Sequence, residues 1–236
     1  MKDSFDGPHT HKYVVRELPK FNKVRSHPDY YMVEENIHVI KNFLSESECD
    51  WFQKIIQESD EDRWEGNSEG EGRSWWFKRI INLNKDQMES DIVSNIVKKI
   101  RLYIDDEEPN LIIRNELSAI HRMPPGDSMF VHCDNPIYEE YDITDKEIEN
   151  VNLGLQYAVI LYLSDFEGGE VYYPYLGIEY KPKKGDALWH PGNKKYTHGV
   201  KKVTGDKTRY ITTTYFTDRE IREKNNDIVG WKHLNH

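Results

Sequence analysis

Apolar residues change their spacing near residue 109, from a helical period to the alternation and short runs typical of strands. Before that point, a capping box of Ser45 and Glu48 opens one amphipathic helix, and residues 86–104 predict a second, longer one. A short apolar run at residues 37–40 predicts a strand ahead of the first helix. The first part of the chain therefore reads as mostly helical support.

The part of the chain after residue 109 consists of short apolar runs separated by Gly, Pro and Asp turn signals. The predicted strands are residues 111–120, 129–133, 155–163, 170–173, 178–181, 187–190, 198–203 and 209–216. So many short strands at close spacing predict a barrel-like double sheet, a jelly roll. The expected fold class is mainly β with α support.

Two histidines and one aspartate in this region suggest a metal centre. His132 and Asp134 lie two apart on a predicted strand, so their side chains project from the same face. His198 can reach the same ion only if the intervening chain folds back as a sheet. Two His and one carboxylate on one side of a metal leave its other side open, as in non-haem Fe(II) oxygenases.

Composition limits the class of protein and its partners. The 236 residues are 37% hydrophobic and 12% aromatic, which suits one folded domain. A net charge of −10 disfavours nucleic acid and anionic membranes as partners. Two cysteines, no apolar run of spanning length and no signal pattern predict a soluble, intracellular (cytoplasmic) protein. Residues 1–30 are polar and predict an N-terminal arm.

Several short motifs occur in a recognisable order between residues 123 and 216. They are His132-Cys133-Asp134-Asn135-Pro136, Leu161-Tyr162-Leu163, Glu167-Gly168-Gly169-Glu170, Pro182-Lys183-Lys184-Gly185-Asp186, His198-Gly199-Val200 and Thr208-Arg209-Tyr210. Together they resemble the 2-oxoglutarate and Fe(II)-dependent oxygenases, in their prolyl 4-hydroxylase-like branch. The resemblance implies a double-stranded β-helix (cupin-like) flanked by N-terminal helices. It also implies one domain over residues 31–236, with helical support at about 37–108, the β-helix at about 109–218 and a tail at 219–236.

The resemblance also implies roles for individual residues. His132, Asp134 and His198 would hold Fe(II) and form the catalytic centre. Arg209 and Tyr162 would bind the far carboxylate of 2-oxoglutarate, which a guanidinium fork matches. Thr213 shares the strand face of Arg209, and we expect it to line the same pocket. The cosubstrates would be 2-oxoglutarate and O2, the products succinate and CO2, and ascorbate a possible reductant.

Two positions depart from the pattern of the family. Met123 stands where many relatives carry a tyrosine that contacts the cosubstrate, and Ile211 stands where some carry Ser or Thr. Neither change removes a metal ligand. His121 and His190 are expected to be hydrogen-bonded structural residues and not further ligands.

The substrate is least constrained by sequence. Acidic segments at residues 58–72 and 136–152 are the regions expected to select it, and Arg73, Trp75 and Trp76 follow the first as candidate substrate contacts in a lid. The leading hypothesis is hydroxylation of a prolyl or other residue in a peptide or protein. The alternatives are hydroxylation of a free amino acid or small metabolite, a nucleic-acid demethylase, which the charge disfavours, and an inactive jelly-roll binding module.

Overall fold

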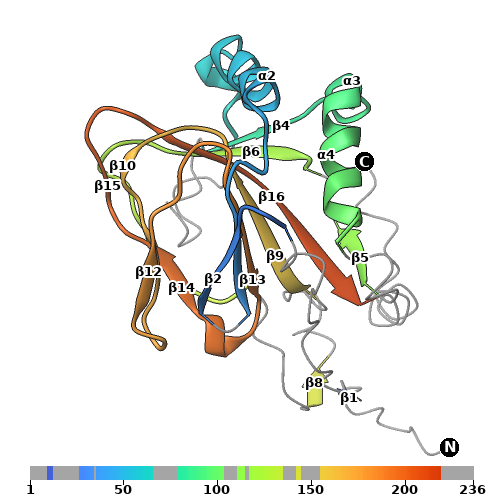
Figure 1. Ribbon diagram of the computed structural model, residues 1–236, viewed down its shortest axis with the longest axis vertical. Helices are drawn as coiled ribbons and strands as arrows, with labels where there is room; N and C mark the ends of the chain where they lie inside the picture. Colours follow the sequence, from blue (N-terminus) through green and yellow to red (C-terminus); the bar gives the residue numbers. More distant parts are fainter. Residues whose placement is uncertain are drawn as a thin grey trace, which may run out of the picture.

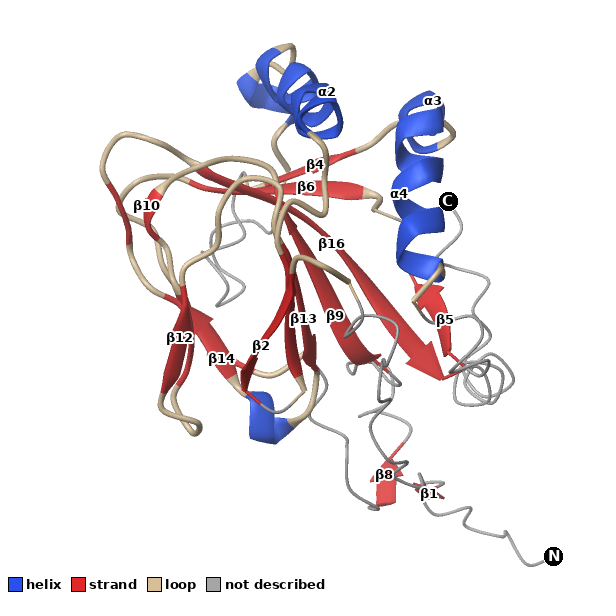
Figure 2. Cartoon of the chain, in the orientation of Figure 1, coloured by secondary structure: helices blue, strands red, loops and turns tan. Residues whose placement is uncertain are grey.

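Two facing β-sheets with helices packed outside the larger one form the described part of the protein (Figures 1 and 2). The computed structural model describes residues 10–12, 27–34, 36–65, 79–103, 111–114, 117–134, 142–144 and 155–218. This arrangement is the predicted jelly roll, so the fold class is confirmed.

The larger sheet is antiparallel, and its long strands β9 and β16 lie at its centre. Its order is β2 (Tyr30–Glu34), β3 (Ile37–Ile40), β13 (Ala187–Pro191), β9 (Leu155–Tyr162), β16 (Arg209–Asp218), β6 (Ala119–Met123) and β4 (Ile80–Asn82), with β5 (Leu111–Arg114) also paired to β16. Strands from the N-terminal support therefore complete the same sheet that the C-terminal core begins.

The smaller sheet carries the candidate ligands. Its order is β12 (Ile178–Tyr180), β11 (Val171–Tyr173), β14 (His198–Val200) and β7 (Met129–His132). Two short pairs lie apart from both sheets: β1 (Thr10–Lys12) with β8 (Asp142–Thr144), and β10 (Glu167–Gly168) with β15 (Val203–Thr204). Strand β7 is the last strand of its sheet among the residues that the structure describes.

The helices differ from expectation in one respect. Helix α2 (Glu46–Gln57) begins at the predicted capping box, in which Ser45 and Glu48 bond each other's backbone N–H groups. The single helix expected at 86–104 is wrong, because the structure has α3 (Lys85–Met88) and α4 (Asp91–Arg101) instead. The hydroxyl of Ser90 accepts the backbone N–H of Val93 and starts a new helix there. Two short 3₁₀ turns, η1 (Glu61–Arg63) and η3 (Lys194–Tyr196), complete the helical content described.

Three other boundaries also differ from the sequence prediction. The run 111–120 divides into β5 and β6, with Leu117 at a positive φ of 50° between them, and the run 198–203 divides into β14 and β15. The expected polar arm at 1–30 contains the paired strand β1. Its remaining residues up to 26, the tail at 219–236, and most of the second acidic segment lie outside the described residues.

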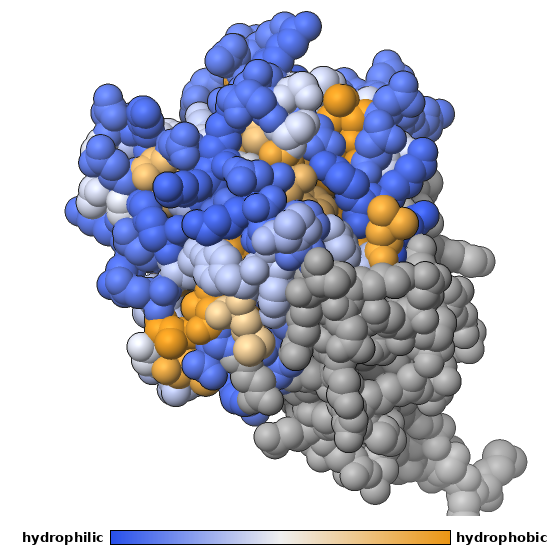
Figure 3. Space-filling model, in the orientation of Figure 1, coloured by the Kyte–Doolittle hydropathy of each residue, from blue (hydrophilic) through white to orange (hydrophobic). Residues whose placement is uncertain are grey.

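Alternation along the central strands separates two apolar layers. On β9, Val159 and Leu161 face the helices, whereas Ile160 and Tyr162 face the smaller sheet. The surface in view is mostly hydrophilic with small apolar patches (Figure 3), in keeping with the 31% charged residues. In the described part of the chain, no helix has the length and apolar character needed to span a membrane.

Candidate metal centre

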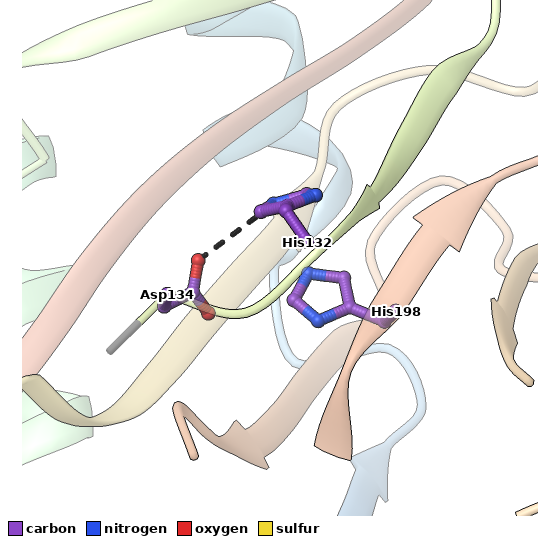
Figure 4. Close-up of side chains that lie close together, drawn as sticks. All are labelled: His132, Asp134 and His198. Carbon is purple, nitrogen blue, oxygen red and sulfur yellow. Dashed lines mark ion pairs between the residues drawn. The ribbon is translucent and has the colours of Figure 1, made fainter. Parts of the chain in front are cut away.

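Two strands of the smaller sheet bring the three candidate ligands together. His132 ends β7, Asp134 follows two residues later, and His198 begins β14 as the direct cross-strand partner of His132. One ligand atom from each of the three residues lies within 4.8 Å of the other two (Figure 4). The predicted grouping of two imidazoles and one carboxylate is therefore present.

Backbone carbonyl groups fix both imidazoles in one tautomer. Nδ1 of His132 lies 3.0 Å from the carbonyl oxygen of Phe130, and Nδ1 of His198 lies 3.1 Å from that of Tyr196. A carbonyl oxygen can only accept, so each Nδ1 carries the proton and donates it. Nε2 is then the ring nitrogen whose lone pair can bind a metal.

The two carboxylate oxygens of Asp134 lie in different environments. Its Oδ1 lies 3.9 Å from Nε2 of His132, while its Oδ2 is buried and has no hydrogen-bond partner among the described residues. Burial lowers the pKa of His198, which Asp134 raises in part, so that imidazole is neutral near pH 7. Two imidazole nitrogens and a carboxylate oxygen fit a divalent cation such as Fe(II).

A buried arginine and tyrosine form the next part of this interior. Arg209, at the start of β16, is 2% exposed, and its guanidinium carbon lies 5.3 Å from the ring centre of Tyr162 and 5.6 Å from that of Phe166. Neither Nε of Arg209 nor the hydroxyl of Tyr162 has a hydrogen-bond partner among the described residues. Burial raises the pKa of Tyr162 to about 12, against the opposing charge of Arg209, so the hydroxyl keeps its proton and can donate.

These unsatisfied donors fit an anion. A guanidinium removed from water costs free energy unless a partner of opposite charge satisfies it. The positive charge of Arg209 also contributes to lowering the pKa of His198, which places both groups in one interior. A carboxylate of 2-oxoglutarate has the charge and the planar pair of oxygens that Arg209 would bind.

Gly169 explains part of the Gly-Gly motif. Its φ is +64°, and a Cβ there would lie 2.9 Å from the ring of Phe166 and 3.2 Å from Cδ of Arg209. A side chain at this position would therefore push against the two groups that frame the guanidinium.

The remaining candidates have different outcomes. Thr213 is half-buried opposite Ile160, on the strand face that it shares with Arg209, and its role in binding the cosubstrate stays a prediction. Met123 lies directly opposite Arg209 and packs against Val200 and Val203, so it offers no hydroxyl there. The candidate substrate contacts lie outside the described residues; they are Arg73, Trp75 and Trp76.

Sequence reasoning gave His190 and Tyr173 no place in the site. His190 on β13 is fully buried, with Nε2 4.0 Å from Oδ2 of Asp134, and neither ring nitrogen has a hydrogen-bond partner among the described residues. His190 lies outside the three-residue ligand group, and the expectation that it is a hydrogen-bonded structural residue stays a prediction. The ring of Tyr173 lies 5.8 Å from the rings of His190 and His198. The alternation of β13 could have shown the side of His190, but not its distance from Asp134.

Comparison with known families finds a match in the strand-rich part of the chain. Residues 118–217 match the 2OG-Fe(II) oxygenase superfamily, a span that includes His132, Asp134, His198 and Arg209. No curated protein sequence matches the chain.

Solved structures share the fold at low sequence identity. A viral collagen prolyl hydroxylase from Paramecium bursaria Chlorella virus-1, in complex with 2OG, is 19% identical with a TM-score of 0.55, over 78% of this chain and 96% of its own. A prolyl hydroxylase from Trichoplax adhaerens, in complex with a hypoxia inducible factor peptide, is 17% identical with a TM-score of 0.59, over 86% and 90%. A Pseudomonas putida prolyl-4-hydroxylase is 15% identical with a TM-score of 0.54, over 84% and 97%.

Proposed function

Because residues 118–217 match the 2OG-Fe(II) oxygenase superfamily, which uses Fe(II), 2-oxoglutarate and O2, we propose that this chain hydroxylates a C–H bond in a peptide or protein. A prolyl residue is the first substrate to test. One oxygen atom of O2 enters succinate, the other enters the hydroxyl group of the product, and the oxo acid loses CO2. Ascorbate is included as a reductant.

The observation that supports the proposal most is the arrangement of the three candidate ligands. Nδ1 of each histidine donates to a backbone carbonyl, which leaves Nε2 as the ring nitrogen that can bind a metal, and Nε2 of His132 lies 3.9 Å from Oδ1 of Asp134. A merely structural cluster would have no need for ligand atoms of three residues that converge within 4.8 Å.

The residues of the chain position the reactants. His132, Asp134 and His198 would hold Fe(II), which supplies the oxidative chemistry when bound. Arg209 and the hydroxyl of Tyr162 would bind the far carboxylate of 2-oxoglutarate and so orient its oxo-acid end toward the metal. The rings of Phe166 and Tyr162 keep water away from the guanidinium, which strengthens its attraction for the carboxylate.

Exposed apolar residues beside His132 support a peptide substrate. On β7, Phe130 is 53% and Val131 40% exposed, and the ring of Phe130 lies 5.9 Å from that of His132. An open groove of about 560 Å³ lies at the start of this strand, with Phe130, Tyr172 and Lys201 in its wall. The Trichoplax neighbour, with this fold, is the one described in complex with a peptide. A strand at the end of its sheet can receive an extended peptide.

Succinate formation tests the proposal. The purified protein is incubated with Fe(II), ascorbate and 2-oxoglutarate, alone and with a panel of proline-containing peptides, other peptides and free amino acids. We expect a peptide to stimulate succinate release and to gain one oxygen atom by mass spectrometry. Stimulation by free amino acids alone would show that the substrate is a small metabolite and not a peptide. Failure to bind either Fe(II) or 2-oxoglutarate would favour an inactive binding module.

A further inference from the structure

His190 lies behind the metal centre on the other sheet. It is fully buried on β13, and its ring packs edge-on against that of His198 with centroids 4.3 Å apart. Its Nε2 lies 4.0 Å from Oδ2 of Asp134, beyond hydrogen-bond distance. Neither atom has a partner in the described part of the chain.

Packing alone does not account for an imidazole at this position. A buried ring with two unsatisfied nitrogens costs free energy that a phenyl ring of similar size avoids. The opposite, helix-facing side of the same strand carries Trp189 in an apolar cluster. The sequence thus keeps a polar ring where an apolar one would stabilise the metal-free protein.

The geometry also disfavours His190 as a fourth ligand. The ligand atoms that lie within 4.8 Å of one another come from His132, Asp134 and His198, and His190 is outside that group. Its nearest partner is the carboxylate oxygen that faces away from His132. An imidazole ring carries at least one N–H, so His190 can donate to that oxygen.

We propose that His190 is a positioning residue that donates its Nε2–H to Oδ2 of Asp134 and so holds Oδ1 toward the metal. The inference rests on the proposed metal centre, and it concerns how the chain orients a ligand. Partners of this kind behind a metal ligand fix its orientation, and their loss costs metal affinity. The larger sheet would then help to set the ligand geometry of the smaller one.

Binding of Mn(II), a redox-stable substitute for Fe(II), tests this role by titration calorimetry on the full chain. His190→Phe is expected to weaken Mn(II) binding by about tenfold to a hundredfold. His190→Gln keeps an N–H near the position of Nε2 and is expected to stay within about threefold of wild type, a smaller change than a lost outer-shell partner causes. Metal-free His190→Phe should unfold at the same or a higher urea concentration than wild type.

His38→Phe is the matched control. His38 is also fully buried, but it lies on β3 opposite Trp189, and its Nδ1 is bonded to the hydroxyl of Tyr30. This variant is expected to lose stability and to keep its Mn(II) affinity. It separates the general cost of replacing a buried histidine from the effect on the metal.

Three outcomes among the variants would overturn the inference. One is unchanged Mn(II) affinity in His190→Phe, and the second is equal weakening in His190→Phe and His190→Gln. The third is weakening by Tyr173→Phe alone, which would move the donor to that hydroxyl. A wild type that binds no divalent cation would overturn both this role and the proposed function. A wild type that binds Mn(II) but consumes no 2-oxoglutarate would contradict only the proposed function.

Discussion

The two faces of the larger sheet differ in the chemistry of their buried side chains. The face toward the helices is mostly apolar, and Val159, Leu161 and Trp189 are fully buried there. The face toward the smaller sheet carries Tyr162, His190 and Arg209, which are equally buried but have unpartnered polar atoms among the described residues. Because successive residues of one strand face opposite ways, neighbours in sequence belong to environments of opposite character.

This difference assigns separate roles to the two faces. The helix-facing layer supplies burial of apolar area, which stabilises the fold. The inner layer gives up part of that stabilisation to hold groups that a metal and an anion would satisfy. Substitutions on the first face should therefore change stability and leave the chemistry intact, and those on the second should do the reverse.

The largest effect is expected at His198, on the inner side. His198→Ala removes a metal ligand, so Fe(II)-dependent succinate release should fall by at least about a thousandfold, which corresponds to about 4 kcal/mol. Circular dichroism should show an unchanged fold. Succinate production at the wild-type rate would remove His198 from the metal centre.

Leu161→Ala tests the opposite face, one residue before Tyr162. Leu161 is fully buried in the helix-facing cluster, so the free energy of unfolding should drop by about 2–5 kcal/mol in urea titrations. Succinate release per folded molecule should stay close to wild type. A loss of turnover without a loss of stability would show that the two faces are not separate.

Arg209→Ala probes the anion site. The concentration of 2-oxoglutarate needed for half-maximal turnover should rise at least about tenfold, the equivalent of about 1.4 kcal/mol. Arg209→Lys keeps the charge but loses the guanidinium fork, so its requirement for 2-oxoglutarate should lie between those of wild type and Arg209→Ala. Mn(II) affinity should not change in either variant. An unaltered requirement for 2-oxoglutarate in Arg209→Ala would place the carboxylate elsewhere.

His121 predicts a smaller, pH-dependent effect. Burial, with a further contribution from Arg209, lowers its pKa to about 4. In the unfolded chain the pKa of His121 is near 6.5, so between about pH 6.5 and 4 the unfolded state binds one proton more than the folded state. As the pH decreases through this range, the free energy of unfolding decreases by up to about 1.4 kcal/mol per pH unit. His121→Gln should reduce the slope of the free energy of unfolding against pH, measured by urea titration between pH 7 and 5, by the equivalent of about one proton. An unchanged slope would contradict the depressed pKa.

Local periodicity accounts for what the sequence predicted well. The spacing of two residues predicted that Asp134 would lie near His132, although β7 ends at His132 and Asp134 follows the strand, and the turn signals delimited most of the strands. Both patterns depend on neighbours along the chain, so they need no knowledge of the packing of the sheets. The same locality explains the missed break at Ser90, because the apolar face continues in phase from one helix to the next.

The position of His190 could not be predicted in this way. It lies on the larger sheet and Asp134 follows a strand of the smaller one, so their proximity results from how the two sheets pack. Spacing in sequence carries no information on that distance. Local patterns do not identify the residues that select the substrate either. The candidate contacts Arg73, Trp75 and Trp76 lie outside the described residues.

A crystal structure of the full chain with Mn(II) and 2-oxoglutarate would test the central claim most directly, through anomalous scattering from the metal. The account predicts one strong anomalous peak, from a metal ion bound by Nε2 of His132, an oxygen of Asp134 and Nε2 of His198. It also predicts that the far carboxylate of 2-oxoglutarate is bound by Arg209. The absence of a peak among these three residues, or a cosubstrate bound away from Arg209, would contradict it.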